Sequence, residues 1–189
     1  QAFERMAWGG KIGRYRVRME WPRDNPVVWK TTTGFPQPAL AEVGGFTRLS
    51  VDLADAGAPK APVGAPLRFQ RVGELQASTY ADWAEISRRM HPLYDKAAQL
   101  APDSPVRAEA ARIAAQTKDP KARAFAALQL VEDKTRYLAL SMGDGGYRPA
   151  PADETWARRF GDCKGKTVLL LALLRELGVD AEPAIVSTS

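Results

Sequence analysis

The stretch RRFGDCKGKTVLLLALLRELGVDAEPAIV, residues 158–186, joins the only cysteine of the chain to its longest apolar run. Residues 168–174 are apolar on every side of a helix, which predicts a central and buried helix. Asp162 is the expected N-cap, because its carboxylate can accept from backbone N–H groups two or three residues later. Gly178 is the expected left-handed stop. After a turn, Ala184-Ile185-Val186 is expected to form a strand.

Cys163 falls at the first helical position of this pattern. Unpaired N–H groups and the positive end of the helix dipole favour a thiolate there. Lys164 and Lys166 add to that bias, whereas Asp162 opposes it. The alternative is a buried cysteine that packs as a small hydrophobe. Composition and spacing leave both interpretations open, and an accessible thiol is what would separate them.

The tripeptide Gly165-Lys166-Thr167 also suggests a phosphate-binding loop. Such a loop needs G-x-x-x-x-G-K-[ST] after a buried strand, so that backbone N–H groups curl around the phosphates. The first glycine would have to stand where Phe160 is, and Gly161 is one residue too close. The preceding residues are charged rather than strand-like. A nucleotide site is therefore not expected.

The residues around Cys163 resemble the nucleophile region of bacterial transglutaminase-like proteins, which belong to the papain-like thiol group. The resemblance is carried by Gly145-Gly146-Tyr147-Arg148-Pro149, Glu154, Trp156, Arg159–Lys164 and Leu169–Gly178. It extends more weakly back to Thr79. The family often has aspartate where this chain has Gly165, and that departure concerns the local loop and substrate contacts rather than the thiol.

The resemblance implies a Cys-His-Asp triad in which Cys163 attacks a carboxamide or peptide carbonyl. The resulting thioester is resolved by an amine or by water, which makes the protein an acyl-transferase or a protease-like hydrolase. Gly161, Asp162 and Lys164 then form the loop that supports the nucleophile.

The family's histidine and aspartate follow the cysteine helix, so both are expected beyond Ser189. Residues 1–189 alone are expected to be inactive. His91, the sole histidine, lies upstream and abuts a proline, so it is a poor candidate for a displaced base. A non-catalytic polypeptide-binding module on the same fold is the open alternative. A downstream histidine and aspartate would favour the enzyme.

The first part of the chain alternates with the period of half-buried strands. In residues 11–21 the inward set is Tyr15, Val17, Met19 and Trp21, and three arginines face the other side. Residues 27–32, 47–53 and, more weakly, 67–72 are further strands, separated by turn formers. We expect an antiparallel, sandwich-like module over residues 1–78, truncated at its start if the chain is an excised segment. It resembles, more weakly, the uncharacterised domain that often precedes such domains in Gram-negative bacteria.

The period changes to that of helices near Ser78, so residues 79–189 are expected to form the incomplete, N-terminal part of a transglutaminase-like domain. Thr79 and Asp82 suggest a capping box, and Trp83 and Met90 are expected in the core. His91-Pro92 should kink or end this first helix.

Two Pro-initiated helices are expected next, at Ser104-Pro105 and Asp119-Pro120. Phe125, Leu128 and Val131 are expected to face inward on the second of them. The fold class is therefore α+β.

The bulk composition excludes several classes of protein. The net charge is +5 over 189 residues, of which +4 falls within residues 1–80, but no dense basic tract or nucleic-acid motif accompanies it. The longest apolar run has seven residues against the roughly 20 that cross a bilayer. We therefore expect a polypeptide partner, no nucleic acid, no transmembrane segment, no metal and no cofactor. The chain begins with Gln1, which suggests a processed or excised segment, and the resemblance favours the periplasm or cell envelope.

Overall fold

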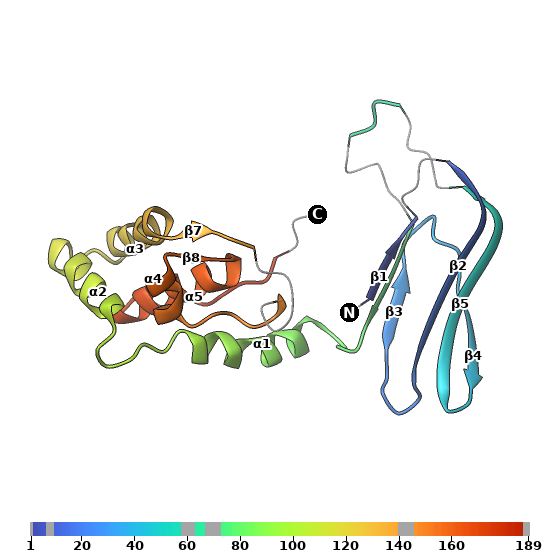
Figure 1. The fold of residues 1–189 in the computed structure, drawn as a ribbon, viewed down its shortest axis with the longest axis horizontal. Helices are drawn as coiled ribbons and strands as arrows, with labels where there is room; N and C mark the ends of the chain where they lie inside the picture. Colours follow the sequence, from blue (N-terminus) through green and yellow to red (C-terminus); the bar gives the residue numbers. More distant parts are fainter. Residues whose placement is uncertain (1, 7–9, 58–62, 67–72, 140–145, 187–189) are drawn as a thin grey trace. The chain divides into compact units, whose positions relative to one another are not determined.

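The computed structural model describes residues 2–6, 10–57, 63–66, 73–139 and 146–186. The chain divides into two compact units, Gln1–Ile86 and Ser87–Ser189, which we take in turn (Figure 1).

The described part of the N-terminal unit holds six strands, which form two antiparallel three-stranded sheets (Figure 1). The first sheet has the order β1-β6-β3 and the second β2-β5-β4. Their bounds are β1 Ala2–Arg5, β2 Lys11–Pro22, β3 Val28–Thr31, β4 Ala39–Val43, β5 Phe46–Gly57 and β6 Glu74–Ser78. The buried side chains of both sheets belong to one apolar cluster, as expected for a sandwich-like module.

The alternation expected for residues 11–21 is confirmed. Tyr15 and Trp21 are buried, and β2 pairs with β5 over its length, so that Val17 lies opposite Val51. On the outer face Arg14 binds Asp52 through two hydrogen bonds of 2.7 Å. The arginine side of β2 is therefore a solvated sheet face.

Three of the strands, β1, β4 and β6, were not expected from the sequence. All five residues of β4 are exposed, so it carries no apolar alternation that could mark it. β6 does alternate, with Leu75 and Ala77 buried, but it is short and otherwise polar. The strand expected over residues 67–72 lies outside the described residues.

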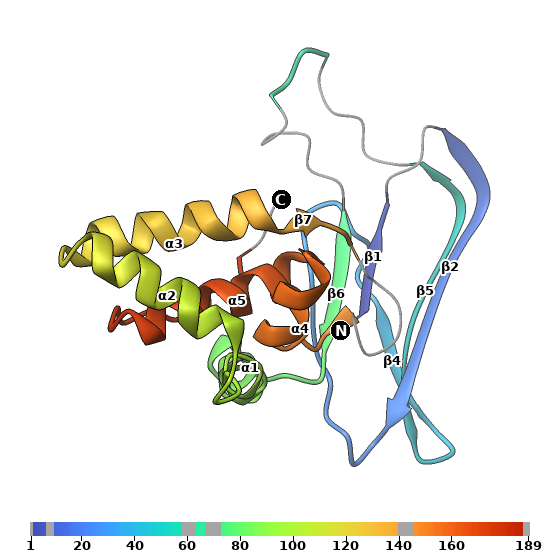
Figure 2. The same ribbon diagram turned by 60° about the vertical axis from the view of Figure 1, so that its left-hand side comes forward.

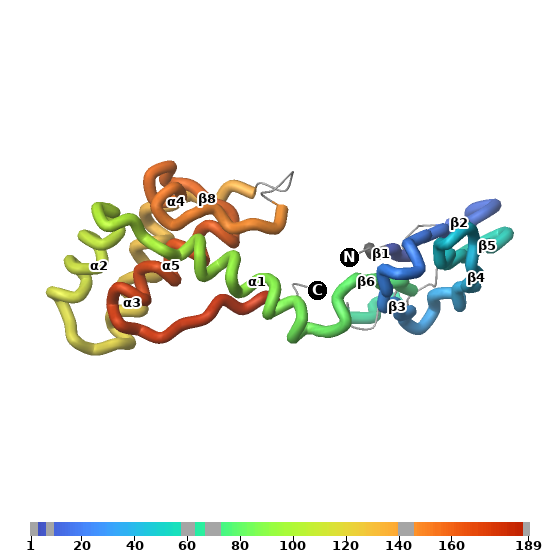
Figure 3. Tube along the Cα trace, turned by 90° about the horizontal axis from the view of Figure 1, so that it is seen from below, coloured from blue at the N-terminus to red at the C-terminus, as the bar shows by residue number. Residues whose placement is uncertain are grey.

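Five helices and a small parallel sheet make up the described part of the C-terminal unit, except that the first turn of α1 falls within the N-terminal unit (Figure 2). The helices are α1 Trp83–Ala97, α2 Pro105–Gln116, α3 Pro120–Lys134, α4 Ala152–Arg158 and α5 Cys163–Glu176. Strands β7 Arg136–Tyr137 and β8 Phe160–Gly161 pair in parallel. Helix α5 contacts α2, α3 and α4, and Figure 3 traces it among them. Its buried Val168, Leu169 and Leu173 confirm the central helix expected from the sequence.

The two Pro-initiated helices begin where the sequence places them. The Ser104 hydroxyl accepts from the Val106 N–H at 3.1 Å, and the Asp119 carboxylate accepts from the Ala122 N–H at 2.9 Å. Each cap is followed by proline in the first turn. These local signals suffice because the cap needs only an acceptor side chain next to a residue that has no N–H to satisfy.

Helix α1 begins at a different cap from the one expected, and it does not end at Pro92. Asp82, not Thr79, caps the helix, its carboxylate accepting from the Glu85 N–H at 2.7 Å. Trp83 is 70% exposed because it lies in the first turn, before the helix reaches the apolar cluster. Pro92 lies inside the helix, which continues to Ala97. A proline inside a helix removes one backbone hydrogen bond, and its ring crowds the carbonyl in the preceding turn. Pro92 is exposed, and the residues after it continue the helix because they pack in the apolar cluster.

Of the three α3 residues expected in the core, Val131 is buried as expected, but Phe125 and Leu128 are not. Phe125 is 61% exposed and Leu128 is 38% exposed, whereas Ala127, Leu130 and Val131 are buried. Apolar residues occur on several faces of α3, so the helical period of the sequence alone did not identify which face is buried. Packing against α5 selects the stripe that contains the small Ala127.

The strand expected at residues 184–186 is not formed. These residues are coil, and Ile185 and Val186 are exposed. A strand requires a neighbouring ladder, and no described segment pairs with this one. Within the described parts of the chain, no helix combines the length and apolarity needed to cross a membrane.

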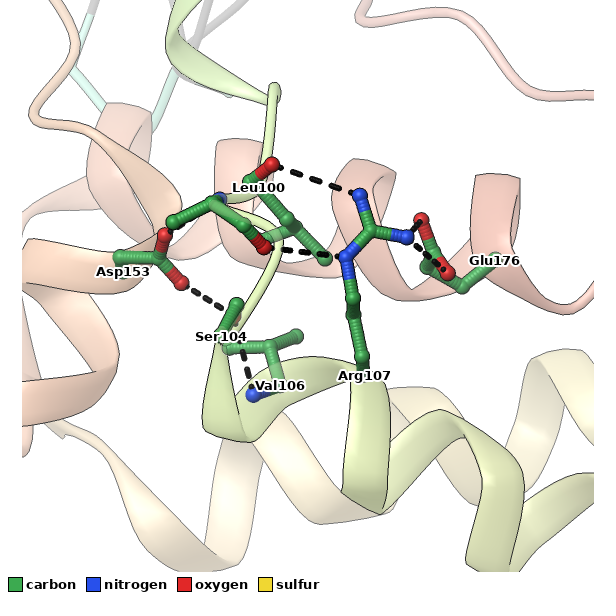
Figure 4. Close-up of polar contacts among 7 residues, drawn as sticks. Leu100, Ser104, Val106, Arg107, Asp153 and Glu176 are labelled. Atoms are coloured by element: carbon green, nitrogen blue, oxygen red, sulfur yellow. Dashed lines mark hydrogen bonds and ion pairs between the residues drawn. The ribbon is translucent and has the colours of Figure 1, made fainter.

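A polar network joins the start of α2 to α4 and to the end of α5 (Figure 4). The Asp153 carboxylate accepts from the Ala101 N–H at 3.0 Å and from the hydroxyl of Ser104. Arg107 donates to the Ala101 carbonyl at 3.0 Å and binds the Glu176 carboxylate at 2.7 and 2.8 Å. Ser104 thus caps α2 and holds α4 at the same time.

Ser104→Ala is expected to lower the free energy of unfolding of the helical unit by about 2 kcal/mol, because it removes an N-cap and a hydrogen bond to a carboxylate. The measurement is urea unfolding followed by far-UV circular dichroism. Ser87→Ala, at an exposed position of α1, is the control and should stay within about 0.5 kcal/mol of the parent. Equal losses in the two variants would contradict the double role of Ser104.

Candidate active site

Cys163 is the first residue of α5, and it is exposed. The chain reaches it from α4 through Arg159, which has the left-handed φ of 59°, and through the two residues of β8. Parallel pairing with β7 holds this approach, since the Arg136 N–H donates to the Arg159 carbonyl at 2.9 Å. The thiol thus lies at a helix start, and the main chain that leads to it is held by pairing with β7.

Asp162 is the N-cap, as expected, and both of its carboxylate oxygens are engaged. One accepts from the Gly165 N–H at 2.9 Å, and the other pairs with the ammonium of Lys164. The side chains of Asp162 and Lys164 are only 12% and 16% exposed. The pair is therefore shielded from solvent, and the negative charge next to Cys163 is balanced.

Lys164 keeps its positive charge in this setting. Burial is the largest influence and lowers its pKa, but the hydrogen bond and charge of Asp162, with smaller effects of Cys163 and Tyr94, raise the pKa of Lys164 above its usual value overall. A fixed ammonium next to the helix start adds to the dipole in favouring an anion there.

Tyr94, on α1, interacts electrostatically with Asp162, Cys163 and Lys164. Tyr94 is 8% exposed, and burial is the main reason that its pKa is raised. The charge of Lys164 lowers this pKa, whereas the charges of Cys163 and Asp162 raise it. The sequence analysis did not select Tyr94, although it lies four residues after Met90 on the helix face that packs inward. Helical spacing from Met90 marks Tyr94 as buried but does not reveal that its neighbours are charged.

Lys166 and Thr167 do not form a phosphate cradle. The Lys166 ammonium donates to the Thr135 carbonyl at 3.0 Å, and the Thr167 hydroxyl donates to the Cys163 carbonyl at 2.7 Å. Lys166 thereby ties the first turn of α5 to the end of α3. Both side chains therefore donate to backbone carbonyls of the chain itself, in keeping with the mismatch between this sequence and the phosphate-binding motif.

Helices α4 and α5 approach closely at Thr155. A Cβ on Gly165 would lie 3.0 Å from the Thr155 hydroxyl oxygen, and one on Gly161 would lie 3.0 Å from its methyl group. Either contact is tighter than packed side chains tolerate without a shift. The glycines of the nucleophile loop therefore serve packing against α4, and a side chain at position 165 would have to displace Thr155.

A pocket of about 50 Å³ opens beside this loop. It is lined by Arg148, Ala150, Thr155, Arg158 and residues 160–162. Thr155 is 1% exposed, and its hydroxyl oxygen has no hydrogen-bond partner among the described residues. Arg159 stays outside this lining, with its guanidinium 3.7 Å from the centre of the Trp156 ring.

The structure brings the expected loop residues Gly161, Asp162 and Lys164 together around Cys163. His91 lies on α1 with its Nε2 3.4 Å from a carboxylate oxygen of Glu182, an exposed pair. Among the described residues, no cluster of three or more His, Cys, Asp or Glu side chains is placed to hold a metal ion.

Comparison with known proteins gives two similarities. Residues 107–188 match the model of the transglutaminase-like superfamily. The fold is similar to that of a crystal structure described as a "putative protease" from Parabacteroides distasonis, with a TM-score of 0.71 and 16% sequence identity. The similarity covers 93% of this chain, which spans 34% of the length of that protein.

A search of curated proteins found no match. The family match covers the second Pro-initiated helix, the close α4–α5 contact and the loop that carries Cys163, and the structural similarity extends over both units. Residues 107–188 are therefore similar to the transglutaminase-like superfamily, and the likeness to the solved structure shows the fold.

Proposed function

We propose that this chain carries the nucleophile of a thiol acyl-transferase or protease-like hydrolase that acts on amide or carboxamide groups of polypeptides. The observation that carries the proposal is the position of Cys163, which is exposed at the first residue of a buried, capped helix. A cysteine that served only as a small hydrophobe would be expected in the core. The superfamily match of residues 107–188 supports the same role.

The proposed reaction begins with attack of the Cys163 sulfur on the carbonyl carbon of the amide. The C–N bond then breaks, the amine leaves with a proton, and the acyl group stays on sulfur as a thioester. An amine or a water molecule attacks the thioester and releases the acyl group, with the proton returning to sulfur. Within this chain, the N–H groups at the start of α5 and the charge of Lys164, which is paired with Asp162, act on the anionic sulfur.

The proton transfers need a general base, which the resemblance places in a histidine oriented by an aspartate, both beyond Ser189. The base would take the thiol proton and give it to the leaving amine. The location proposed with this activity is the periplasm or cell envelope, again on the resemblance. Detection of the protein in the periplasmic fraction of its host would test that location.

The thiol of Cys163 is expected to react with iodoacetamide in the native chain at a rate within about tenfold of that in the urea-unfolded chain. The reason is its exposure at the helix start, and the measurement is mass-spectrometric alkylation at a fixed pH. Because Cys163 is the only cysteine, Cys163→Ser must abolish labelling. A native rate lower by several orders of magnitude would show a buried thiol and remove the main support for the proposal.

Residues 1–189 alone are expected to cleave or transamidate amide substrates about 10²–10⁴-fold more slowly than a longer chain that supplies the base. The assay follows ammonia release from a glutamine-containing peptide and incorporation of a labelled amine. Cys163→Ala in the longer chain should abolish both activities. Turnover by residues 1–189 within about tenfold of that of the longer chain, and lost in Cys163→Ala, would contradict the missing base and direct attention to His91.

A further inference from the structure

Strand β2 is a long strand at the edge of its sheet. The sheet has the order β2-β5-β4, so β2 has a neighbouring strand on one side only (Figure 2). It is 12 residues long, and residues 11–21 make no backbone hydrogen bond to any described segment other than β5. The outward N–H and C=O groups can therefore pair with an incoming strand. Natural proteins usually shorten or cover such edges, so a long open edge indicates an interaction surface.

The solvent-facing side chains of β2 and β5 carry more positive than negative charge. Arg14 and Arg16 both pair with the carboxylate of Asp52, at 2.7 and 3.1 Å, so one negative charge serves two cations. The next ion pair along the same face, between Arg48 and Glu20, balances itself. A surplus of positive charge therefore remains on the β2 side of the face, before any further arginine is counted.

Arg18 adds to this surplus. It is exposed, it lies opposite the uncharged Ser50 of β5, and it has no hydrogen-bond or ion-pair partner among the described residues. Side chains of a strand added to the free edge would have their Cβ atoms about 5 Å from those of β2. An acidic residue opposite Arg18 would thus meet a guanidinium group that no carboxylate occupies. The arginines at positions 14, 16 and 18 also repeat with the two-residue period of one strand face.

The inward side of β2 favours apolar residues in the same partner. Val17 and Met19 are only half-buried, although both pack against the apolar cluster of the sandwich. Side chains at alternate positions of an added strand would lie beside these two residues and cover more of their apolar surface. The edge therefore suits a strand in which acidic and apolar residues alternate.

We propose that the free edge of β2 binds an extended polypeptide segment by strand addition, and that this segment alternates acidic with apolar residues. Backbone hydrogen bonds to β2 provide the attachment, and Arg18 with the neighbouring surplus of positive charge selects the acidic side chains. This inference concerns the N-terminal unit and does not rest on the proposed reaction of Cys163.

A second copy of this chain is a less suitable occupant of the edge. In every antiparallel register that pairs all of residues 14–18 with β2 of a copy and keeps the two faces aligned, at least one arginine lies opposite another. Like charges directly opposite each other destabilise a sheet. A nucleic acid would satisfy the arginines, but it has no row of amide groups that could extend the ladder of β2. An acidic polypeptide meets both requirements.

The test measures binding of a fluorescent peptide, Glu-Val-Glu-Val-Glu-Val-Glu with blocked ends, to residues 1–189 by fluorescence anisotropy at 0.15 M salt. Two control peptides carry the same charge: one has proline in place of each valine, and the other has its glutamates and valines in separate blocks. The alternating peptide is expected to bind about tenfold more tightly than either control, because proline cannot join a ladder and the blocks lose the match to both faces. Its binding should also slow amide hydrogen exchange within residues 11–22.

Variants assign the binding to β2. Arg18→Glu is expected to weaken binding of the alternating peptide about tenfold, because a repulsive cross-strand pair replaces an attractive one. Arg18→Gln, which only removes the attraction, should weaken it several-fold. Arg88→Glu is the matched control, since Arg88 is exposed on α1, has no partner among the described residues and gives the same change in net charge. It should stay within about twofold of the parent, because salt screens distant charges. Far-UV circular dichroism checks that each variant is folded.

The remaining outcomes each overturn the proposal. Equal affinity for all three peptides, or for an oligothymidylate, without slower exchange in residues 11–22 would show only a surface for polyanions. A dimer that protects residues 11–22 without any peptide would show that a second copy occupies the edge. Failure of the alternating peptide to bind, or equal losses in Arg18→Glu and Arg88→Glu, would remove β2 as the binding site.

Discussion

The carboxylate of Asp162 makes the contact on which the rest of the site depends. Helix α5 is buried over most of its length, so the N–H groups of its first turn cannot all be left to water. Asp162 satisfies the Gly165 N–H with one oxygen and holds the ammonium of Lys164 with the other. The cap thus permits an apolar helix to begin close to the surface, and Cys163 is the residue that occupies this beginning.

The position of that helix start is set by elements that are distant in sequence. Lys166 reaches the carbonyl of Thr135 at the end of α3, and β8 pairs with β7, which follows α3 directly. On the other side, α4 packs against the first turn of α5 through Thr155. These contacts pre-organise the thiol, and a nucleophile that attacks a substrate carbonyl requires such fixed placement.

Structural features that depend only on residues close together in the sequence were predictable. The caps at Ser104, Asp119 and Asp162 and the stop at Gly178 were found at their expected positions because each needs only one side chain or one positive φ. The same holds for the long alternating strand β2, whose pattern reports its own burial.

Features that depend on what packs against a segment were not predictable. Phe125 and Leu128 of α3 were wrongly expected in the core because packing against α5 selects the buried face. The coil at residues 184–186 was expected as a strand because the sequence does not show whether a ladder neighbour is present. In the site, Tyr94 and Thr155 were missed for the same reason. Nothing near them in sequence indicates that one adjoins Lys164 and that the other lacks a hydrogen-bond partner.

The glycine at position 165 connects the packing of the site to its chemistry. Any side chain there would begin 3.0 Å from the hydroxyl oxygen of Thr155, so an aspartate at this position would bring a carboxylate of the protein's own to that region. With glycine, α4 and α5 can approach closely, and the hydroxyl stays without a partner in the described part of the chain. The close approach of the two helices is thus a consequence of the glycine at this position.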